Sequence, residues 1–205
     1  EGVRLGVGVT DLVRRHPAVI AQTAMTLDHV TGGRFILGVG TGEALNITPI
    51  GLVNDHPVQR LDEGLTIIRR LFDTHEPVDF TGEFFQLREM ALGVRPIGDA
   101  PPPIWLAAHR PRALALTGRV ADGWMPIAIP LDGMTAMIAQ LHQFAREAGR
   151  DPQSIEVIVG ANIDISEKSL GADRAIFTGS EDQVRSDIEA VKKLGASEIF
   201  FVIFH

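Results

Sequence analysis

Residues 34–46 decide the fold and read Arg34-Phe35-Ile36-Leu37-Gly38-Val39-Gly40-Thr41-Gly42-Glu43-Ala44-Leu45-Asn46. The apolar run Phe35 to Leu37 is too short for a helix and is bracketed by glycines, so it predicts a buried strand. Glycines then occupy alternate positions, and a carboxylate and a carboxamide follow at Glu43 and Asn46. A strand that runs into glycines and polar groups is typical of sites at the carboxyl ends of parallel strands. A tight turn without a ligand is the alternative, and the two polar side chains favour a site.

The composition is that of an ordinary globular protein. The chain has 205 residues, of which 45% are hydrophobic and 22% charged, enough for one sizeable domain. A formal net charge of −7 argues against a nucleic-acid-binding surface and against a basic patch for anionic membranes. The absence of cysteine excludes disulfides and a cysteine nucleophile and fits a reducing compartment. We therefore expect a cytoplasmic protein that binds a small molecule, with neither nucleic acid nor membrane as partner.

Strands and helices alternate along the sequence. Apolar and β-branched runs predict strands at 3–9, 35–39, 104–108, 122–126, 155–165 and 199–204, and a hairpin at 78–87. Helical periodicity with start signals predicts helices that begin at Pro17, Pro57, Pro111, Leu131 and Ser180. Residues 47–55 are expected to be irregular, and no helix clearly starts after Gly42 and Glu43.

This alternation predicts an α/β fold in a single domain over residues 1–205. We expect a (β/α)8 TIM barrel that lacks its first two strand–helix units, and hence an incomplete N-terminus, because residue 1 is Glu and the chain begins almost inside a strand. An open doubly wound sheet is the alternative architecture. The barrel is favoured because polar pairs follow strand after strand, at Thr10-Asp11, Glu43-Asn46 and His109-Arg110.

Several chemistries lack the residues that they require. The histidines form no metal-ligand pair such as H-E-x-x-H, and no G-x-S-x-G elbow exists for a serine hydrolase, so no metal site is expected. The run 38–43 resembles the start of a dinucleotide-binding fingerprint but lacks its third glycine. Glu43 is the carboxylate that lies beside glycine-opened backbone at a strand end, and we predict that it handles a proton or orients a bound ring. A loop carboxylate bonded to nearby N–H groups is the alternative role.

Six segments in this order resemble the bacterial luciferase-like superfamily: 5–10 (Leu-Gly-Val-Gly-Val-Thr), 15–21 (Arg-His-Pro-Ala-Val-Ile-Ala), 26–34, 37–46, 103–108 and 121–124. The segment Gly42-Glu43-Ala44-Leu45-Asn46 is most similar to the deazaflavin-dependent branch, which includes methylenetetrahydromethanopterin reductase and a glucose-6-phosphate dehydrogenase. The resemblance implies a barrel that holds coenzyme F420 at its strand ends, usually in a homodimer. The first two strands of the family, which often carry a catalytic histidine, have no counterpart in this sequence.

The resemblance also implies a set of cofactor-binding residues. A non-proline cis peptide or bulge is expected at Gly8-Val9, behind the ring, with Thr10 and Asp11 beside it. Glu43 and Asn46 are expected near the ring and its hydroxylated side chain. The remaining implied residues are Gly40 and Thr41 after the second strand, Ala107, Ala108 and His109 after the third, and Gly179, which precedes a helix N-terminus where a phosphate can bind.

Three functions are compatible with the sequence. The first is an oxidoreductase that transfers a hydride between F420 and a small organic substrate. The second is a luciferase-like monooxygenase that uses FMN. The third is a non-catalytic or inactive truncated member, a hypothesis motivated by the missing leading strands.

Overall fold

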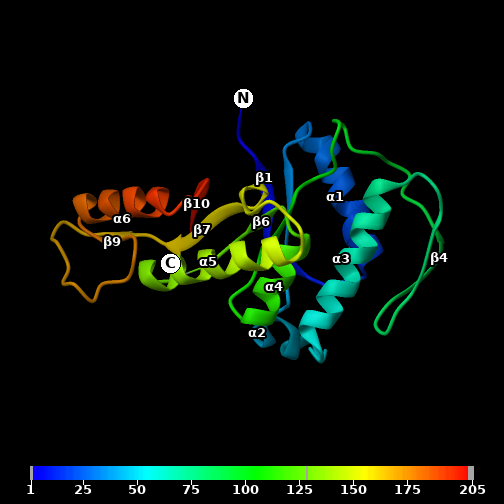
Figure 1. Cartoon of the computed structure of the whole chain (residues 1–205), viewed down its shortest axis with the longest axis horizontal. Helices are drawn as coiled ribbons and strands as arrows, with labels where there is room; N and C mark the ends of the chain where they lie inside the picture. The colour runs from blue at the N-terminus through cyan, green and yellow to red at the C-terminus, as the bar shows by residue number, and fades with distance from the viewer. Residues whose placement is uncertain (1, 128, 203–205) are drawn as a thin grey trace. The chain divides into compact units, whose positions relative to one another are not determined.

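The computed structural model describes residues 2–127 and 129–202 and divides into two compact units, 1–107 and 108–205. The first unit contains a parallel sheet in the order β1-β2-β5, in which β2 is central (Figure 1). Helices α1 and α3 pack against each other, and β3 and β4 form an antiparallel hairpin. The elements of this unit are β1 (Leu5–Asp11), α1 (Pro17–Thr31), β2 (Phe35–Gly40), α2 (Ala44–Ile47), the 3-10 turn η1 (Thr48–Ile50), α3 (Pro57–Asp73), β3 (Val78–Thr81), β4 (Gln86–Met90) and β5 (Ile104–Ala107).

The predicted starts of the two long helices in this unit are confirmed. The His16 imidazole caps α1, because its Nδ1 accepts the Ala18 N–H at 3.2 Å, and Gly32 ends the helix in the left-handed conformation. Helix α3 buries the apolar side chains that the three- and four-residue spacing placed on one face, including Leu61, Leu65 and Ile68.

Strand β1 is irregular at the place that the family resemblance implied. The Gly8-Val9 peptide bond is cis, and the pairing of β1 with β2 shifts its register between Val7 and Thr10. At Gly38 on β2, a Cβ atom would lie 1.9 Å from the Val7 carbonyl oxygen. Glycine is therefore required at position 38 because the two backbones approach closely, and that requirement involves no ligand.

The second unit also contains a three-stranded parallel sheet. Strands β6, β7 and β10 run parallel in that order, β8 pairs with β9, and α4 packs against α5. A capping box starts α6, with Ser180 as N-cap and Gln183 as its partner, as predicted. The elements are α4 (Pro111–Val120), β6 (Gly123–Trp124), α5 (Leu131–Glu147), η2 (Pro152–Ser154), β7 (Glu156–Asn162), β8 (Asp164–Ile165), β9 (Thr178–Gly179), α6 (Glu181–Lys193) and β10 (Glu198–Val202).

Two local predictions were wrong. The segment 47–55, expected to be irregular, instead begins with the end of the one-turn helix α2 and the 3-10 turn η1, and the fully buried Ile47 side chain anchors both. The long strand expected at 155–165 is interrupted after Asn162, and its last two residues pair with β9 instead. The predicted final strand is confirmed as far as Val202, and positions 203 and 204 lie outside the described residues.

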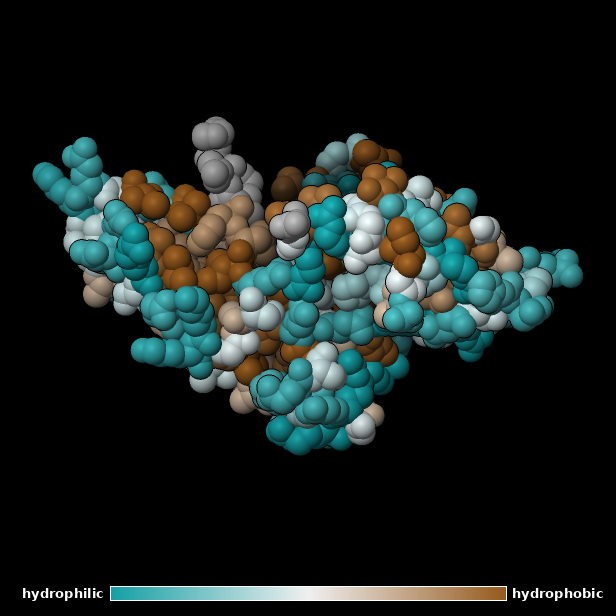
Figure 2. All heavy atoms as spheres, turned by 90° about the horizontal axis from the view of Figure 1, so that it is seen from above, coloured by the Kyte–Doolittle hydropathy of each residue, from teal (hydrophilic) through white to brown (hydrophobic). Residues whose placement is uncertain are grey.

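The surface mixes apolar and polar side chains. Figure 2 shows a group of apolar side chains in the part of the second unit that carries α6 and β9, with polar side chains around it. Large apolar side chains exposed in the second unit are Ile165, Leu170 and Phe201. Among the helices that the structure describes, none combines the length and the apolarity needed to cross a membrane.

Candidate functional site

The carboxyl ends of the three strands in the first unit lie side by side. The register pairs Asp11 of β1 with Gly40 of β2, and Gly40 in turn with Ala107 of β5. The Val9 side chain covers β2, since its Cγ2 lies 3.0 Å from where a Cβ of Gly40 would be. Thr10 is half-buried beside them. Residues expected from three separate segments of sequence thus meet at one edge of this sheet, where parallel α/β sheets carry their sites.

Asp11 organises the loop that leaves β1. Its carboxylate is buried, and Oδ1 accepts the backbone N–H groups of Val13 at 3.0 Å and Arg14 at 2.9 Å. Oδ2 accepts the Arg14 Nε–H at 2.5 Å, which also pairs the two charges. Three donors from its own loop therefore occupy this carboxylate, and the arrangement holds the Arg14 guanidinium at the strand end.

The loop after β2 presents two polar side chains to solvent. Gly42 has φ +83°, a conformation that L-residues rarely adopt, and it turns the chain into α2. Glu43 precedes α2, and its Oε2 accepts the Asn46 Nδ2–H at 3.4 Å. Both side chains are exposed. A carboxylate and a carboxamide are thus available to a ligand at the carboxyl end of β2.

Asn54 fixes this loop from behind. Its Nδ2 donates to the Thr41 carbonyl at 3.0 Å and to the Gly42 carbonyl at 3.1 Å. Its Oδ1 is buried and accepts no hydrogen bond from any residue that the structure describes. Asn54 and Arg14 were not identified from the sequence, because their partners become visible only when the loops are folded.

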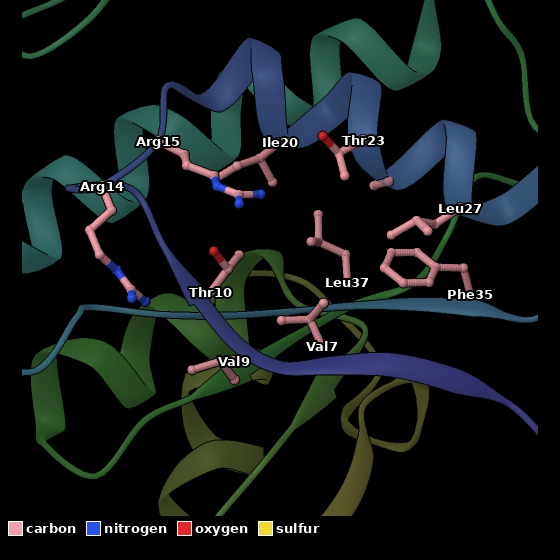
Figure 3. Close-up of a pocket in the computed structure, with 11 residues that line it drawn as sticks. Val7, Val9, Thr10, Arg14, Arg15, Ile20, Thr23, Leu27, Phe35 and Leu37 are labelled. Carbon is pink, nitrogen blue, oxygen red and sulfur yellow. The ribbon is translucent and has the colours of Figure 1, made fainter. Parts of the chain in front are cut away.

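A cavity of about 440 Å³ lies between α1 and the strands β1 and β2 (Figure 3). Figure 3 shows Thr10 on the α1 side of β1 and Val9 on the opposite side, and the Arg15 side chain extends toward the cavity. The lining is mainly aliphatic and comes from Val7, Ile20, Ala24, Leu27, Phe35 and Leu37, with Thr10, Arg14 and Arg15 at one end. None of Gly40, Thr41, Glu43 and Asn46 lines it. This cavity is therefore distinct from the polar loop after β2.

The other predicted residues belong to the second unit. The Ala108 carbonyl accepts the indole N–H of the buried Trp124 at 2.8 Å, and the His109 Nε2 accepts the Ile127 N–H at 3.2 Å. The second bond places the proton of a neutral His109 on Nδ1. Gly179 is buried with φ +111°, and the N–H of the following Ser180 donates to the Gln183 side chain at 3.0 Å. The capping box thus already satisfies the first N–H group that a phosphate would meet there.

No group of three histidine, aspartate or glutamate side chains within 2–127 and 129–202 has the geometry of a metal site.

Comparison with known proteins identifies the family. The family model described as "Luciferase-like monooxygenase" matches residues 1–176. The chain belongs to this family. It is 42% identical to the phthiodiolone/phenolphthiodiolone dimycocerosates ketoreductase of Mycobacterium tuberculosis over 177 residues, which cover 82% of this chain and 46% of that protein. It is 36% identical to the F420-dependent glucose-6-phosphate dehydrogenase of Nakamurella multipartita over 165 residues, 78% of this chain and 48% of that protein.

The fold comparison agrees with the family. A solved F420-dependent secondary alcohol dehydrogenase, in complex with an F420-acetone adduct, matches 99% of this chain with a TM-score of 0.89 at 21% identity, and the match covers 74% of that chain. The predicted α/β fold of the luciferase-like barrels is therefore confirmed. The chain spans about half the length of the curated relatives that it matches.

Proposed function

We propose that this chain is part of an oxidoreductase that transfers a hydride between coenzyme F420 and a small organic substrate. The observation that carries the proposal is the exposed Glu43–Asn46 pair, held at the carboxyl end of β2 next to the ends of β1 and β5. The names of two related proteins, an F420-dependent dehydrogenase of 36% identity and an F420-dependent alcohol dehydrogenase of the same fold, support the choice of cofactor. The homodimer, the single domain and the cytoplasmic location expected from the sequence stay predictions.

The residues at these strand ends fit a flavin-like ring with a hydroxylated chain. Such a ring is planar and carries uncharged donors and acceptors, and the loop after β2 offers an exposed carboxamide at Asn46 and an exposed carboxylate at Glu43. Val9, Thr10 and Gly40 would lie against the ring, and Thr41, Glu43 and Asn46 would bind its polar groups. Ala107 would complete the strand-end surface in this unit, and Ala108, His109 and Gly179 are the residues proposed from the second unit.

Asp11 holds the loop rather than the ligand in this proposal, because its carboxylate already has three donors. Bound F420 would supply or accept the hydride. Reduction of a ketone also requires a proton at the carbonyl oxygen, and oxidation of the alcohol requires its removal. The Glu43 carboxyl group, exposed and hydrogen-bonded to Asn46, is proposed to hold that proton.

A luciferase-like monooxygenase that uses FMN is the second candidate, and it is favoured by the family's description as luciferase-like monooxygenases. Titration of the purified chain with F420 and, separately, with reduced FMN under anaerobic conditions distinguishes the two. Binding of F420 but not of reduced FMN is expected. Binding of reduced FMN alone would replace the first proposal by the second, and binding of neither would favour a non-catalytic chain.

The role of Glu43 is tested by Glu43→Gln. We expect substrate-dependent reduction of F420 to fall by about 10²- to 10⁴-fold while the dissociation constant of F420 stays within about threefold, because the amide keeps the size but cannot exchange the proton. Glu76→Gln changes another exposed glutamate, located after α3, and is expected to leave both quantities unchanged. Unchanged turnover in Glu43→Gln would remove the proton-handling role.

A further inference from the structure

A second cavity lies in the second unit at the carboxyl end of β7. Its volume is about 570 Å³, within the usual range of small-molecule sites. It is enclosed by the end of β7, the start of α5 and the segment between β8 and β9. None of the residues predicted from the sequence to bind a cofactor lines it. Ligands of α/β proteins bind at the carboxyl ends of parallel strands, so its location is that of a functional cavity.

The lining is mostly aliphatic. The apolar residues that line it are Pro130, Leu131, Ala161, Ala172, Ala175 and Ile176. Such a surface favours a ligand with an aliphatic part, because burial of apolar area stabilises the complex by about 25 cal/mol per Å².

Among the described residues that line this cavity, the one cation, Arg174, is already neutralised. The Arg174 guanidinium donates to both Asp187 carboxylate oxygens, at 2.6 Å and 2.8 Å, and also to the Thr178 carbonyl at 2.8 Å. The side chains of Arg174 and Asp187 are only 16% and 8% exposed. Withdrawing Arg174 toward a phosphate or a carboxylate ligand would leave Asp187 buried without its counter-ion, which is strongly unfavourable.

The other polar side chains favour an uncharged ligand. Asp132 is exposed at the rim and adds a negative charge that repels an anion. The Asn162 side chain lines the cavity and makes no hydrogen bond within the described residues. A carboxamide both donates and accepts, so it can bind a ketone oxygen through Nδ2 or an alcohol hydroxyl through Oδ1.

We infer that this cavity binds an uncharged, mainly aliphatic ketone or the corresponding alcohol, and that it excludes phosphorylated and carboxylate ligands. The binding follows from the cavity alone, whereas its identification as the substrate rests on the proposed hydride-transfer function. The inference separates this chain from the relative named for glucose 6-phosphate, whose substrate is anionic.

The test compares 2-octanone, octanoate and glucose 6-phosphate as probes of the purified chain, by ligand-observed NMR titration. Octanoate has the same chain length as 2-octanone but carries a charge, so the pair isolates the charge. We expect 2-octanone to bind at least tenfold more tightly than octanoate and glucose 6-phosphate not to bind. Equal or tighter binding of either anion would overturn the inference.

Two variants locate the site. Ala175→Trp fills the cavity and is expected to weaken 2-octanone binding at least tenfold, whereas Ala139→Trp on the exposed face of α5 is expected to have no effect. Asp132→Asn removes the rim charge and is expected to raise the affinity for octanoate about threefold. Equal 2-octanone affinity in Ala175→Trp and in the unchanged protein would overturn the location.

A parallel F420 titration keeps the two proposals apart. If the purified chain binds 2-octanone but not F420, the proposed function is refuted and this inference stands. If it binds F420 but not 2-octanone, only this inference is refuted.

Discussion

Replacement of Asp187 by asparagine should destabilise the second unit strongly. The Asp187 carboxylate binds the Arg174 guanidinium through two hydrogen bonds and also accepts the Phe177 N–H at 2.8 Å. Removing one partner of a buried ion pair costs about 3–5 kcal/mol, because the other charge stays buried without compensation. Arg174 keeps carbonyl acceptors at Ala175 and Thr178, so we expect the low end, about 3 kcal/mol. For a chain of this length that free energy lowers Tm by about 6–12 °C.

The assay follows the emission of Trp124 during urea unfolding in a Trp105→Phe background. Trp124 is fully buried in the second unit, and its indole N–H is bonded to Ala108, so its emission reports on that unit. Glu189→Gln is the control, because it breaks an ion pair with Lys192 in the same unit. The Glu189 side chain is 62% exposed, so the loss of this pair should cost little. The midpoint of this variant is expected to stay within the error of the measurement.

The stabilisation from Asp187 should also depend on pH. Burial is the largest single influence and would raise the pKa of Asp187, but hydrogen bonds from Arg174 and the Phe177 N–H, with the charge of Arg174, hold the pKa below its ordinary value. A carboxyl whose pKa is lowered on folding stabilises the protein fully above its unfolded pKa of about 3.9 and loses that effect as the pH falls through the folded pKa. The difference between Asp187→Asn and the unchanged protein should therefore be constant from pH 7 to about pH 5 and shrink below about pH 4. A difference under about 1 kcal/mol at pH 7, or one that grows on acidification, would refute this reasoning.

Two further substitutions test the first unit. Gly38→Ala should lower the free energy of unfolding by about 3 kcal/mol or more, because the new Cβ would lie 1.9 Å from the Val7 carbonyl oxygen. The change is measured as a fall in Tm. Gly93→Ala is the control and should leave Tm unchanged, because no atom lies within 4 Å of the position of its Cβ. An equal Tm for both variants would show that β1 can move away. Glu63→Ala should speed amide hydrogen exchange at Phe85 about thirtyfold, since the Glu63 carboxylate accepts that N–H at 2.6 Å and a hydrogen bond to a charged group is worth about 2 kcal/mol. Unchanged exchange there would show that the hairpin is held by packing alone.

The sequence determined the features whose interactions are local. His16 and Pro17 start α1, and the Ser180–Gln183 box starts α6, because a cap and its partner lie within four residues of each other. The spacing of apolar residues identified the buried faces of the long helices for the same reason. The sequence also indicated the polar residues that follow the strands, because parallel neighbouring strands bring their carboxyl ends to the same edge of the sheet.

Only the tertiary structure decided how those strand ends are used. Gly38 serves the approach of Val7, and Asn54 supports a loop 12 residues earlier in the chain; both contacts depend on how separate segments pack. The one-turn helix α2 forms because Ile47 finds a buried position, which its short sequence does not specify. Arg174, in a segment for which the sequence predicted neither helix nor strand, becomes the buried partner of Asp187, and no other described residue that lines the adjoining cavity is a cation. Contacts between distant residues are set by packing rather than by spacing, so the sequence indicated the polar groups of the strand ends but not the charge of this cavity.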